Sequence, residues 1–218
     1  DGHAQFFRAY YAIRTPMSSP ATGEPTNMVY GFTAMLLKLL RDENPDHLAV
    51  VIDVPSDEES FRTEIDPEYK ANREPPPDDF GSQVDRCLEI LKALEIPILG
   101  EPVVEADDVI ASLVKRMREE QPEMDIRIIS RDKDLTQLID DRVELFDAHK
   151  GATVSPDDVF KTPGMEIPPS MVADILALMG DSSDNIPGVT GIGPKTAAKL
   201  VMEYGSIAGI YENIDQIK

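Results

Sequence analysis

Short apolar runs rich in β-branched residues alternate with helical patterns through most of the chain, and this alternation limits the folds open to it. The runs HLAVVIDV (47–54) and DIRIIS (125–130) are typical of buried strands, and VELFD (143–147) is a weaker third. Between them, apolar residues recur at helical spacing over 29–39 and 109–117. Strands that alternate with helices favour an α/β fold, with a mostly parallel sheet flanked by helices.

The pattern becomes helical from about residue 155 onward. PPSMVADILALMG and PKTAAKLVMEYG each end in a glycine that suits the end of a helix. We therefore predict an α/β core over residues 1–154 and a helical subdomain over residues 155–218.

The composition excludes several classes of protein. The 218 residues, 41% of them hydrophobic, are enough for a sizeable core. One cysteine, Cys87, excludes an intramolecular disulfide framework and fits a reducing compartment. No apolar run approaches the roughly 20 residues that cross a bilayer, and no signal segment opens the chain. We expect a cytoplasmic protein that does not enter a membrane.

Acidic residues lie at the positions where an α/β fold would be expected to bind ligands. In open α/β sheets, ligands gather at the carboxyl ends of the strands. Asp53 follows AVVI, and Asp132 and Asp134 follow RIIS within two to four residues. EADDVIASL and GDSSDN carry acids three residues apart. Asp1 opens the chain where a strand would have to precede it, as if that strand had been cut off. Five segments thus deliver nine carboxylates to what could be one sheet edge: Asp1, Asp53, Glu105, Asp107, Asp108, Asp132, Asp134, Asp181 and Asp184.

Such a cluster needs cations, although any one of these acidic pairs alone would usually be a solvated helix cap. Carboxylates within about 4 to 6 Å of each other repel by about 1 kcal/mol or more per pair. Oxygen ligands without His or Cys suit Mg²⁺ or Mn²⁺. Two such ions about 4 Å apart can activate a water and stabilise the leaving oxygen in phosphodiester cleavage. The net charge of −20 then does not exclude nucleic acid, because the acids are concentrated where cations sit.

Basic residues are few, and several occur in two segments. FRTEIDPEYKANR contains Arg62, Tyr69, Lys70 and Arg73. If this segment is helical, Lys70 and Arg73 share a face and Tyr69 can stack on a base. The alternative is a surface helix with ordinary charges. In FFRAYYAI, a helix would aim Arg8 at the rim of the acid cluster.

A glycine-rich turn follows the last acidic segment. GVTGIGPKT differs from the phosphate loop GxxxxGK[ST] because Pro194 is inserted and no strand precedes it, which excludes an NTPase. What remains is a hairpin between two helices whose backbone can approach an anion, or a simple link between packed helices. The candidate residues for contact with an anion here are Gly188, Gly191, Gly193, Lys195, Thr196 and Lys199.

Five stretches together resemble a known family: DGHAQFFRAYYAI, FRTEIDPEYKANR, EADDVIASL, RDKDLTQLI and GDSSDNIPGVTGIGPKTAAKL. They are similar to the 5′-nuclease domain of bacterial DNA polymerase I, within the flap-endonuclease superfamily. The resemblance covers nearly the whole chain in the family's order. It implies a PIN-like fold with a helical arch at about 62–85 and a helix-three-turn-helix element at about 180–203. It also implies metal-dependent 5′-3′ exonuclease and flap endonuclease activity on DNA with 5′ flaps, nicks or gaps, in replication and repair.

The resemblance also assigns roles to residues. The nine carboxylates match the acids that hold two metal ions. Lys70 and Arg73 match arch residues that contact the scissile phosphate, Tyr69 matches the neighbouring aromatic, and Arg62 and Arg8 match basic positions beside the site. The turn from residue 188 to 195 resembles the duplex-binding hairpin, whose carbonyls can also hold K⁺.

The resemblance implies a monomeric piece of a longer bacterial polymerase I chain, associated with the nucleoid. Ser130 and Arg131 depart from the family pattern, which has small or uncharged residues there. Two other classes of protein remain as alternatives, namely a PIN-type ribonuclease and a non-catalytic protein that binds DNA structures.

Overall fold

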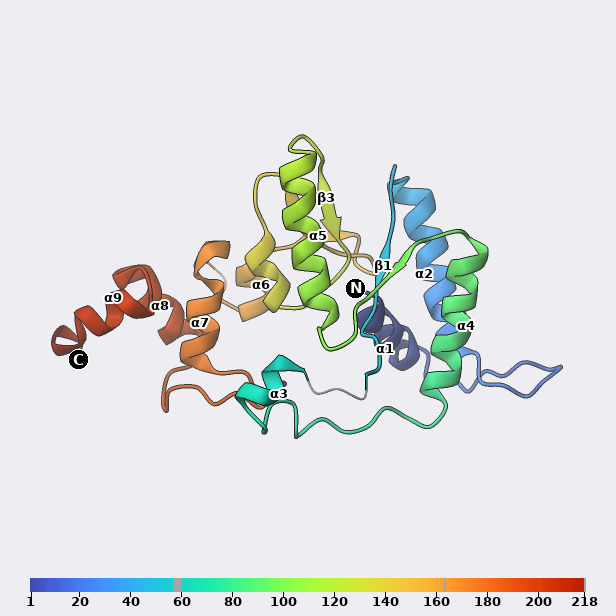
Figure 1. The fold of residues 1–218 in the computed structure, drawn as a ribbon, viewed down its shortest axis with the longest axis horizontal. Coiled ribbons are helices and arrows are strands. Elements are labelled where there is room, and N and C mark those ends of the chain that lie inside the picture. The colour runs from blue at the N-terminus through green and yellow to red at the C-terminus, as the bar shows by residue number, and fades with distance from the viewer. Residues whose placement is uncertain (57–59, 163, 218) are drawn as a thin grey trace. The chain divides into compact units, whose positions relative to one another are not determined.

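The computed structural model describes residues 1–56, 60–162 and 164–217, which form two compact units (Figure 1). Unit 1 comprises Asp1–Glu59, Glu74–Leu113 and Ala148–Gly151. Unit 2 comprises Ser60–Arg73, Val114–Asp147 and Ala152–Lys218. Each unit is therefore assembled from segments that lie far apart in the sequence.

Unit 1 packs three helices against a small parallel sheet. Its elements are α1 (Gly2–Ala12), α2 (Asn27–Glu43), β1 (Val50–Val51), α4 (Phe80–Ala93), β2 (Ile98–Leu99) and the first part of α5 (Ala106–Glu120). Strand β1 pairs with β2 in parallel, with Val50 opposite Ile98. Helices α2 and α4 lie side by side (Figure 1). Phe6 and Phe32 meet edge to face in the core, with ring centroids 4.8 Å apart. The helix predicted around 29–39 is confirmed, because its apolar spacing gives α2 one buried face.

Unit 2 contains a second sheet and most of the short helices. Its elements are α3 (Phe61–Ile65), the second part of α5, β3 (Ile126–Ile128), η1 (Asp134–Leu138), β4 (Val143–Asp147), β5 (Ala152–Val154), α6 (Pro156–Phe160), η2 (Pro169–Met171), α7 (Val172–Met179), α8 (Pro194–Tyr204), α9 (Ile207–Glu212) and η3 (Ile214–Gln216). The sheet order is β3-β4-β5, with β3–β4 parallel and β4–β5 antiparallel.

The α/β fold with mostly parallel pairing is confirmed, but the described strands form two small sheets instead of one. The run 47–54 provides only two residues of strand, whereas the weaker candidate at 143–147 is a full strand with buried side chains. Strand β5 was not expected from the sequence. Its segment begins beside Gly151, which has a φ of 65° and shapes the turn before it.

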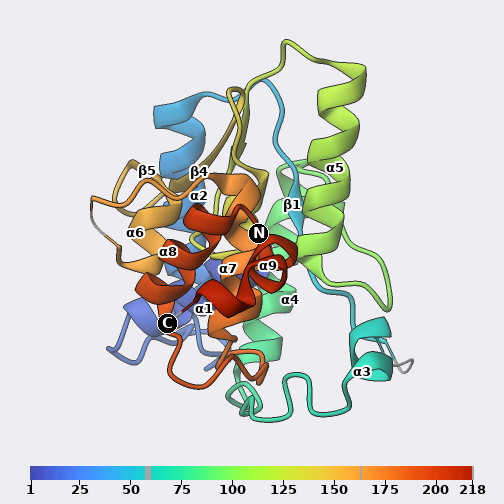
Figure 2. The ribbon, with the colours of Figure 1, turned by 90° about the vertical axis from the view of Figure 1, so that its left-hand side faces the viewer.

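The helices at the end of the chain form a core of their own, and α7, α8 and α9 are grouped in Figure 2. The fully buried Ala197 and Ala198 let α8 approach α7 closely. Both predicted glycine stops are confirmed, since Gly180 caps α7 at φ 72° and Gly205 caps α8 at φ 84°. Within the described ranges, no helix combines the length and apolar character that a bilayer crossing requires.

The segment FRTEIDPEYKANR is helical only at its start. Helix α3 ends at Ile65, and Asp66 is extended at φ −135° and ψ 102°, as a residue before proline prefers. Turns follow up to residue 72, and Lys70 has a φ of 57°. The shared helical face considered for Lys70 and Arg73 is therefore wrong, because Pro67 ends the helix before it reaches them.

Candidate metal centre

The nine predicted carboxylates are divided between the two units. Asp1, Asp53, Glu105, Asp107 and Asp108 belong to unit 1, and Asp132, Asp134, Asp181 and Asp184 belong to unit 2.

Two aspartates of unit 1 lie at the amino ends of helices. Asp1 caps α1, where its Oδ1 accepts a hydrogen bond from the N–H of Ala4 at 3.0 Å. Asp53 follows β1, and its Oδ1 accepts from the N–H of Ala106, the first residue of α5, at 2.8 Å. The positive end of each helix stabilises the negative charge of the carboxylate beside it.

His3 is a neighbour of Asp53 that no sequence pattern singles out. The N–H of Asp53 donates to Nδ1 of His3 at 3.1 Å, so Nδ1 acts as an acceptor and carries no proton. Burial lowers the pKa of His3, although the charge of Asp53 opposes this effect. The lowered pKa favours the neutral imidazole, whose Nδ1 supports the backbone at Asp53 and also lies 3.4 Å from Oδ2 of the Asp53 carboxylate.

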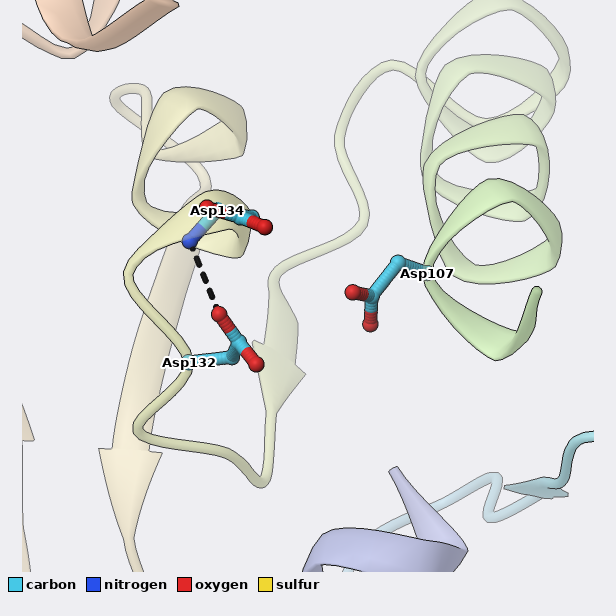
Figure 3. A group of neighbouring side chains, drawn as sticks. All are labelled: Asp107, Asp132 and Asp134. Atoms are coloured by element: carbon cyan, nitrogen blue, oxygen red, sulfur yellow. Dashed lines mark hydrogen bonds between the residues drawn. The ribbon is translucent and has the colours of Figure 1, made fainter. Parts of the chain in front are cut away.

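Three more acids of unit 1 gather at the start of α5. The N–H of Glu105 donates to Oδ2 of Asp108 at 3.1 Å, which closes the first turn of the helix. Asp107 projects from the same turn (Figure 3). The preceding loop contains Val103 at φ 69°, a conformation that a β-branched residue rarely adopts. The tertiary structure thus holds a strained backbone two residues before Glu105.

In unit 2, Asp132 lies in the loop that follows β3, and Asp134 is the first residue of η1. The N–H of Asp132 donates to Oγ of Ser130 at 3.1 Å, and Oδ1 of Asp132 accepts from the N–H of Asp134 at 3.0 Å (Figure 3). These local bonds turn the chain directly into η1. Ser130 is almost fully buried, and its side chain has a structural role in the turn.

Asp181 is held in a tight loop after α7. The backbone groups of Asp181 and Ile186 pair in both directions at 2.8 Å, and its carboxylate accepts bonds from the N–H and hydroxyl of Ser183. Its other oxygen lies 2.7 Å from Nζ of Lys133. Burial acts to raise the pKa of Asp181, but the bonds from Lys133 and Ser183 outweigh it and lower this pKa.

Carboxylate oxygens of Asp134, Asp181 and Asp184 all lie within 4.8 Å of one another. Asp181 and Asp184 are only 8% and 7% exposed. Burial, followed by the charge of Asp132, raises the pKa of Asp134 to about 6. Lys133 already pairs with Asp181, but three carboxylates whose oxygens lie this close together are still a set of hard oxygen donors that fits a divalent cation.

Replacement of Asp134 with asparagine is expected to stabilise the metal-free protein at pH 7.5. Because the pKa of Asp134 is raised from 3.8 to about 6, its ionisation opposes folding above pH 6, and this penalty disappears as the pH falls towards 4. The upper limit of the penalty is about 3 kcal/mol, which solvent at this half-buried side chain reduces to about 1–2 kcal/mol. Urea unfolding with a chelator at pH 4 and pH 7.5 measures it. A variant less stable than the parent at pH 7.5 would contradict this expectation.

Asp184 is in contact with the segment that carries the predicted basic residues. Its Oδ2 accepts from the hydroxyl of Tyr69 at 3.1 Å and lies 4.0 Å from Nζ of Lys70. Its Oδ1 is bound by the guanidinium of Arg73. The structure therefore brings three predicted site residues from one segment to a predicted metal ligand more than a hundred positions away.

Two family models match nearly the whole chain. Residues 1–164 match the model described as 5′-3′ exonuclease, N-terminal resolvase-like domain, and residues 167–218 match 5′-3′ exonuclease, C-terminal SAM fold. The chain belongs to the 5′-3′ exonuclease family. The predicted protein family and the predicted enzyme class, a nuclease, are confirmed.

Individual relatives of this exonuclease family agree with the assignment. The 5′-3′ exonuclease of Aquifex aeolicus is 38% identical over 218 residues, which are all of this chain and 73% of that protein. The DNA polymerase I of Mycobacterium tuberculosis is 42% identical over 222 residues, again covering the whole chain. The chain spans 24% of the length of that polymerase, so it corresponds to one part of such proteins.

Solved structures of a bacteriophage enzyme share the fold. A 5′-exonuclease of bacteriophage T5 with bound zinc has a TM-score of 0.73 and 24% identity, over 98% of this chain and 77% of its own. A bacteriophage T5 flap endonuclease in complex with DNA and metal ions has a TM-score of 0.70, over 97% of this chain and 76% of its own. At this level of identity the likeness confirms the fold.

In this 5′-3′ exonuclease family member, the glycines of the predicted hairpin differ in their surroundings. A Cβ on Gly188 would lie 2.3 Å from the backbone of Met179, so this glycine is required by packing within the chain. Gly191 needs its positive φ of 83° but has open space around it. Gly193 is the N-cap of α8 and is also open. Gly191 and Gly193 thus remain accessible to a ligand, whereas Gly188 holds the turn against α7.

Two basic side chains beside Asp132 were not selected from the sequence as site residues. Lys133, between Asp132 and Asp134, donates to Asp181 and also contacts Oγ of Ser183 at 3.2 Å. Lys133 could have been predicted from the sequence, because it lies between two candidate metal ligands in RDKD. Arg131 lies 3.4 Å from the buried carboxylate of Asp147, which explains a charge at this position.

Proposed function

We propose that this chain is a structure-specific 5′-3′ exonuclease and 5′-flap endonuclease that hydrolyses DNA phosphodiester bonds with two ions, Mg²⁺ or Mn²⁺. One observation carries the proposal. Three carboxylates of unit 2 lie within 4.8 Å of one another, and one of them is bound by Arg73 and approached by Lys70. Acidic ligands for cations and basic groups for a phosphate are what hydrolysis of a phosphodiester requires.

We propose metal-binding roles for the carboxylates of both units: Asp1, Asp53, Glu105, Asp107, Asp108, Asp132, Asp134, Asp181 and Asp184. All are oxygen donors, and several are already stabilised as anions by helix ends or hydrogen bonds. When bound, the ions would supply an activated water and neutralise the charge that develops on the phosphate.

The basic residues would bind and orient the scissile phosphate. We propose this role for Lys70 and Arg73, whose charges are held together by Asp184. Arg62, with its guanidinium 4.5 Å above the Phe61 ring, and Arg8 of α1 would contact neighbouring phosphates. Tyr69 would contact the substrate beside them, although its hydroxyl also supports Asp184. The product would carry a 5′-phosphate.

The glycine-rich turn would bind the duplex. The N-terminus of α8 has no side-chain cap, so its first N–H groups are available to a phosphate. Lys195, Thr196 and Lys199 lie on the following helix, and carbonyls of the turn could also hold K⁺. This short basic strip would be sufficient for docking in an otherwise acidic protein.

The polymerase relatives support a wider setting for this activity. We propose that the chain acts as part of a longer DNA polymerase I, in bacterial DNA replication and repair at the nucleoid. It would act as a monomer on DNA with 5′ flaps, nicks or gaps, in the cytoplasm and not at a membrane.

A cleavage assay on a 5′-labelled flap duplex tests the proposed function. We expect Mg²⁺- or Mn²⁺-dependent release of the flap, and no cleavage with a chelator or with Asp132→Ala plus Asp134→Ala. If the parent chain binds the flap duplex but cleaves it no faster than this double variant, the protein would be a non-catalytic DNA-binding protein. Faster cleavage of a matched RNA substrate would favour a ribonuclease.

A further inference from the structure

Two asparagine side chains join the segment that carries Lys70 and Arg73 to the loop that carries Asp181 and Asp184. We propose that Asn72 and Asn185 are positioning residues for phosphodiester cleavage. They would hold Lys70 and Arg73 close enough to the carboxylates for the basic residues and the carboxylates to act on the same phosphate. This inference rests on the proposed function.

The two amides form a reciprocal clamp. Nδ2 of Asn72 donates to the carbonyl of Ser182 at 2.8 Å, and Nδ2 of Asn185 donates to the carbonyl of Glu68 at 2.7 Å. Each asparagine thus reaches from its own loop to the backbone of the other. The bonds are directed at main-chain oxygens, so they fix the paths of the two loops.

Backbone geometry places the clamp on both sides of Lys70. The N–H of Lys70 donates to the carbonyl of Asp184 at 2.9 Å, between the two amide bonds. Lys70 and Asn185 have φ values of 57° and 59°, in the left-handed region. Asparagine tolerates this conformation better than most residues, whereas lysine needs support from its surroundings. The clamp supplies that support.

The basic side chains need such a device because they are long and partly exposed. The side chain of Arg73 is 53% exposed and that of Lys70 is 23% exposed. Arg73 also donates from Nε to the carbonyl of Ser183 at 3.3 Å, so its guanidinium is fixed to the same loop as its carboxylate partner. A shift of about 1 Å in a positioned catalytic group can cost about 100-fold in rate. Loss of one amide should therefore reduce the chemical rate more than substrate binding.

The test uses Asn72→Ala and Asn185→Gly. Glycine keeps the positive φ at position 185 and removes only the amide. Asn213→Ala is the matched control, because Asn213 also donates its amide to a backbone carbonyl, that of Gly209 at 2.9 Å. Single-turnover cleavage of a 5′-flap duplex in Mg²⁺ gives the chemical rate. Fluorescence anisotropy in Ca²⁺ gives the dissociation constant, and thermal unfolding confirms folding.

We expect each clamp variant to cleave about 10-fold more slowly, with a dissociation constant within 2-fold of the parent and with the control unchanged. Parental or higher rates in both variants would overturn the inference, as would a loss confined to binding. Asn72 is exposed, so Asn72→Ala decides the question if Asn185→Gly does not fold.

A double-mutant cycle separates the inference from the function on which it rests. In a chain with Lys70→Ala and Arg73→Ala, Asn72→Ala should slow cleavage by less than 2-fold, because there is no basic side chain left to position. A further 10-fold loss in this background would overturn the inference. If Lys70→Ala plus Arg73→Ala itself leaves cleavage unchanged, the proposed role of the basic residues fails instead.

Discussion

Asparagine in place of Asp181 is expected to slow flap cleavage by about 1,000-fold while leaving the fold intact. The new side chain has nearly the same shape, and its Oδ1 can still accept the bonds from Ser183. It lacks the negative charge that would bind a cation beside Asp134 and Asp184. A bound metal contributes several kcal/mol to the stabilisation of charge in the transition state, and about 4 kcal/mol corresponds to this loss of rate.

Single-turnover cleavage at saturating DNA, measured over a range of Mg²⁺ concentrations, checks the effect of Asp181→Asn. Asp141→Asn is the matched control, because the carboxylate of Asp141 is 80% exposed and pairs with Arg118 at the surface of the same unit. We expect the control to cleave at the parental rate. A rate for Asp181→Asn within 10-fold of the parent at all Mg²⁺ concentrations would remove Asp181 from the metal centre.

Alanine in place of Gly180 is expected to destabilise the protein by about 4 kcal/mol. Gly180 has φ 72° and ψ 177°, a region that is almost restricted to glycine and costs other residues about 1–3 kcal/mol. A Cβ at this position would lie 2.3 Å from the nitrogen of Gly188 and 2.7 Å from the carbonyl oxygen of Ile186. These are backbone atoms that cannot rotate away, so overpacking adds about 1–3 kcal/mol.

Urea unfolding at constant pH in a chelator measures this loss. Gly205→Ala is the control, because Gly205 has a similar φ of 84° but no atom within 4 Å of its added Cβ. We expect the control to lose about 1–2 kcal/mol, from backbone conformation alone. Equal losses in the two variants would show that the contact between Gly180 and Gly188 does not restrict the turn. Activity lost only in Gly180→Ala would link this packing to the adjacent Asp181.

The sequence could predict those features that depend on neighbours along the chain. The apolar spacing of α2 predicted a helix because its buried face repeats every turn, and Gly205 predicted the end of α8 because a helix commonly stops in a conformation that suits glycine. The turn between Asp132 and Asp134 is also local, since it is closed by hydrogen bonds two residues apart. Sheet formation was less predictable, because whether Val50 and Val51 extend into a longer strand depends on pairing with β2, which lies 48 residues later in the chain.

The amino-acid sequence was therefore sufficient to predict the chemistry of this protein: many carboxylate oxygens as ligands, fewer basic residues, and a family whose motifs run through the whole chain. Which of these groups contact each other depends on the tertiary structure. Asp184 is bound by Tyr69 and Arg73, Asp181 by Lys133, and Gly188 packs against Met179. These partners lie from 9 to 115 positions apart in the sequence. Contacts of this kind depend on the path of the backbone between the partners, which packing of the whole unit fixes and local spacing does not.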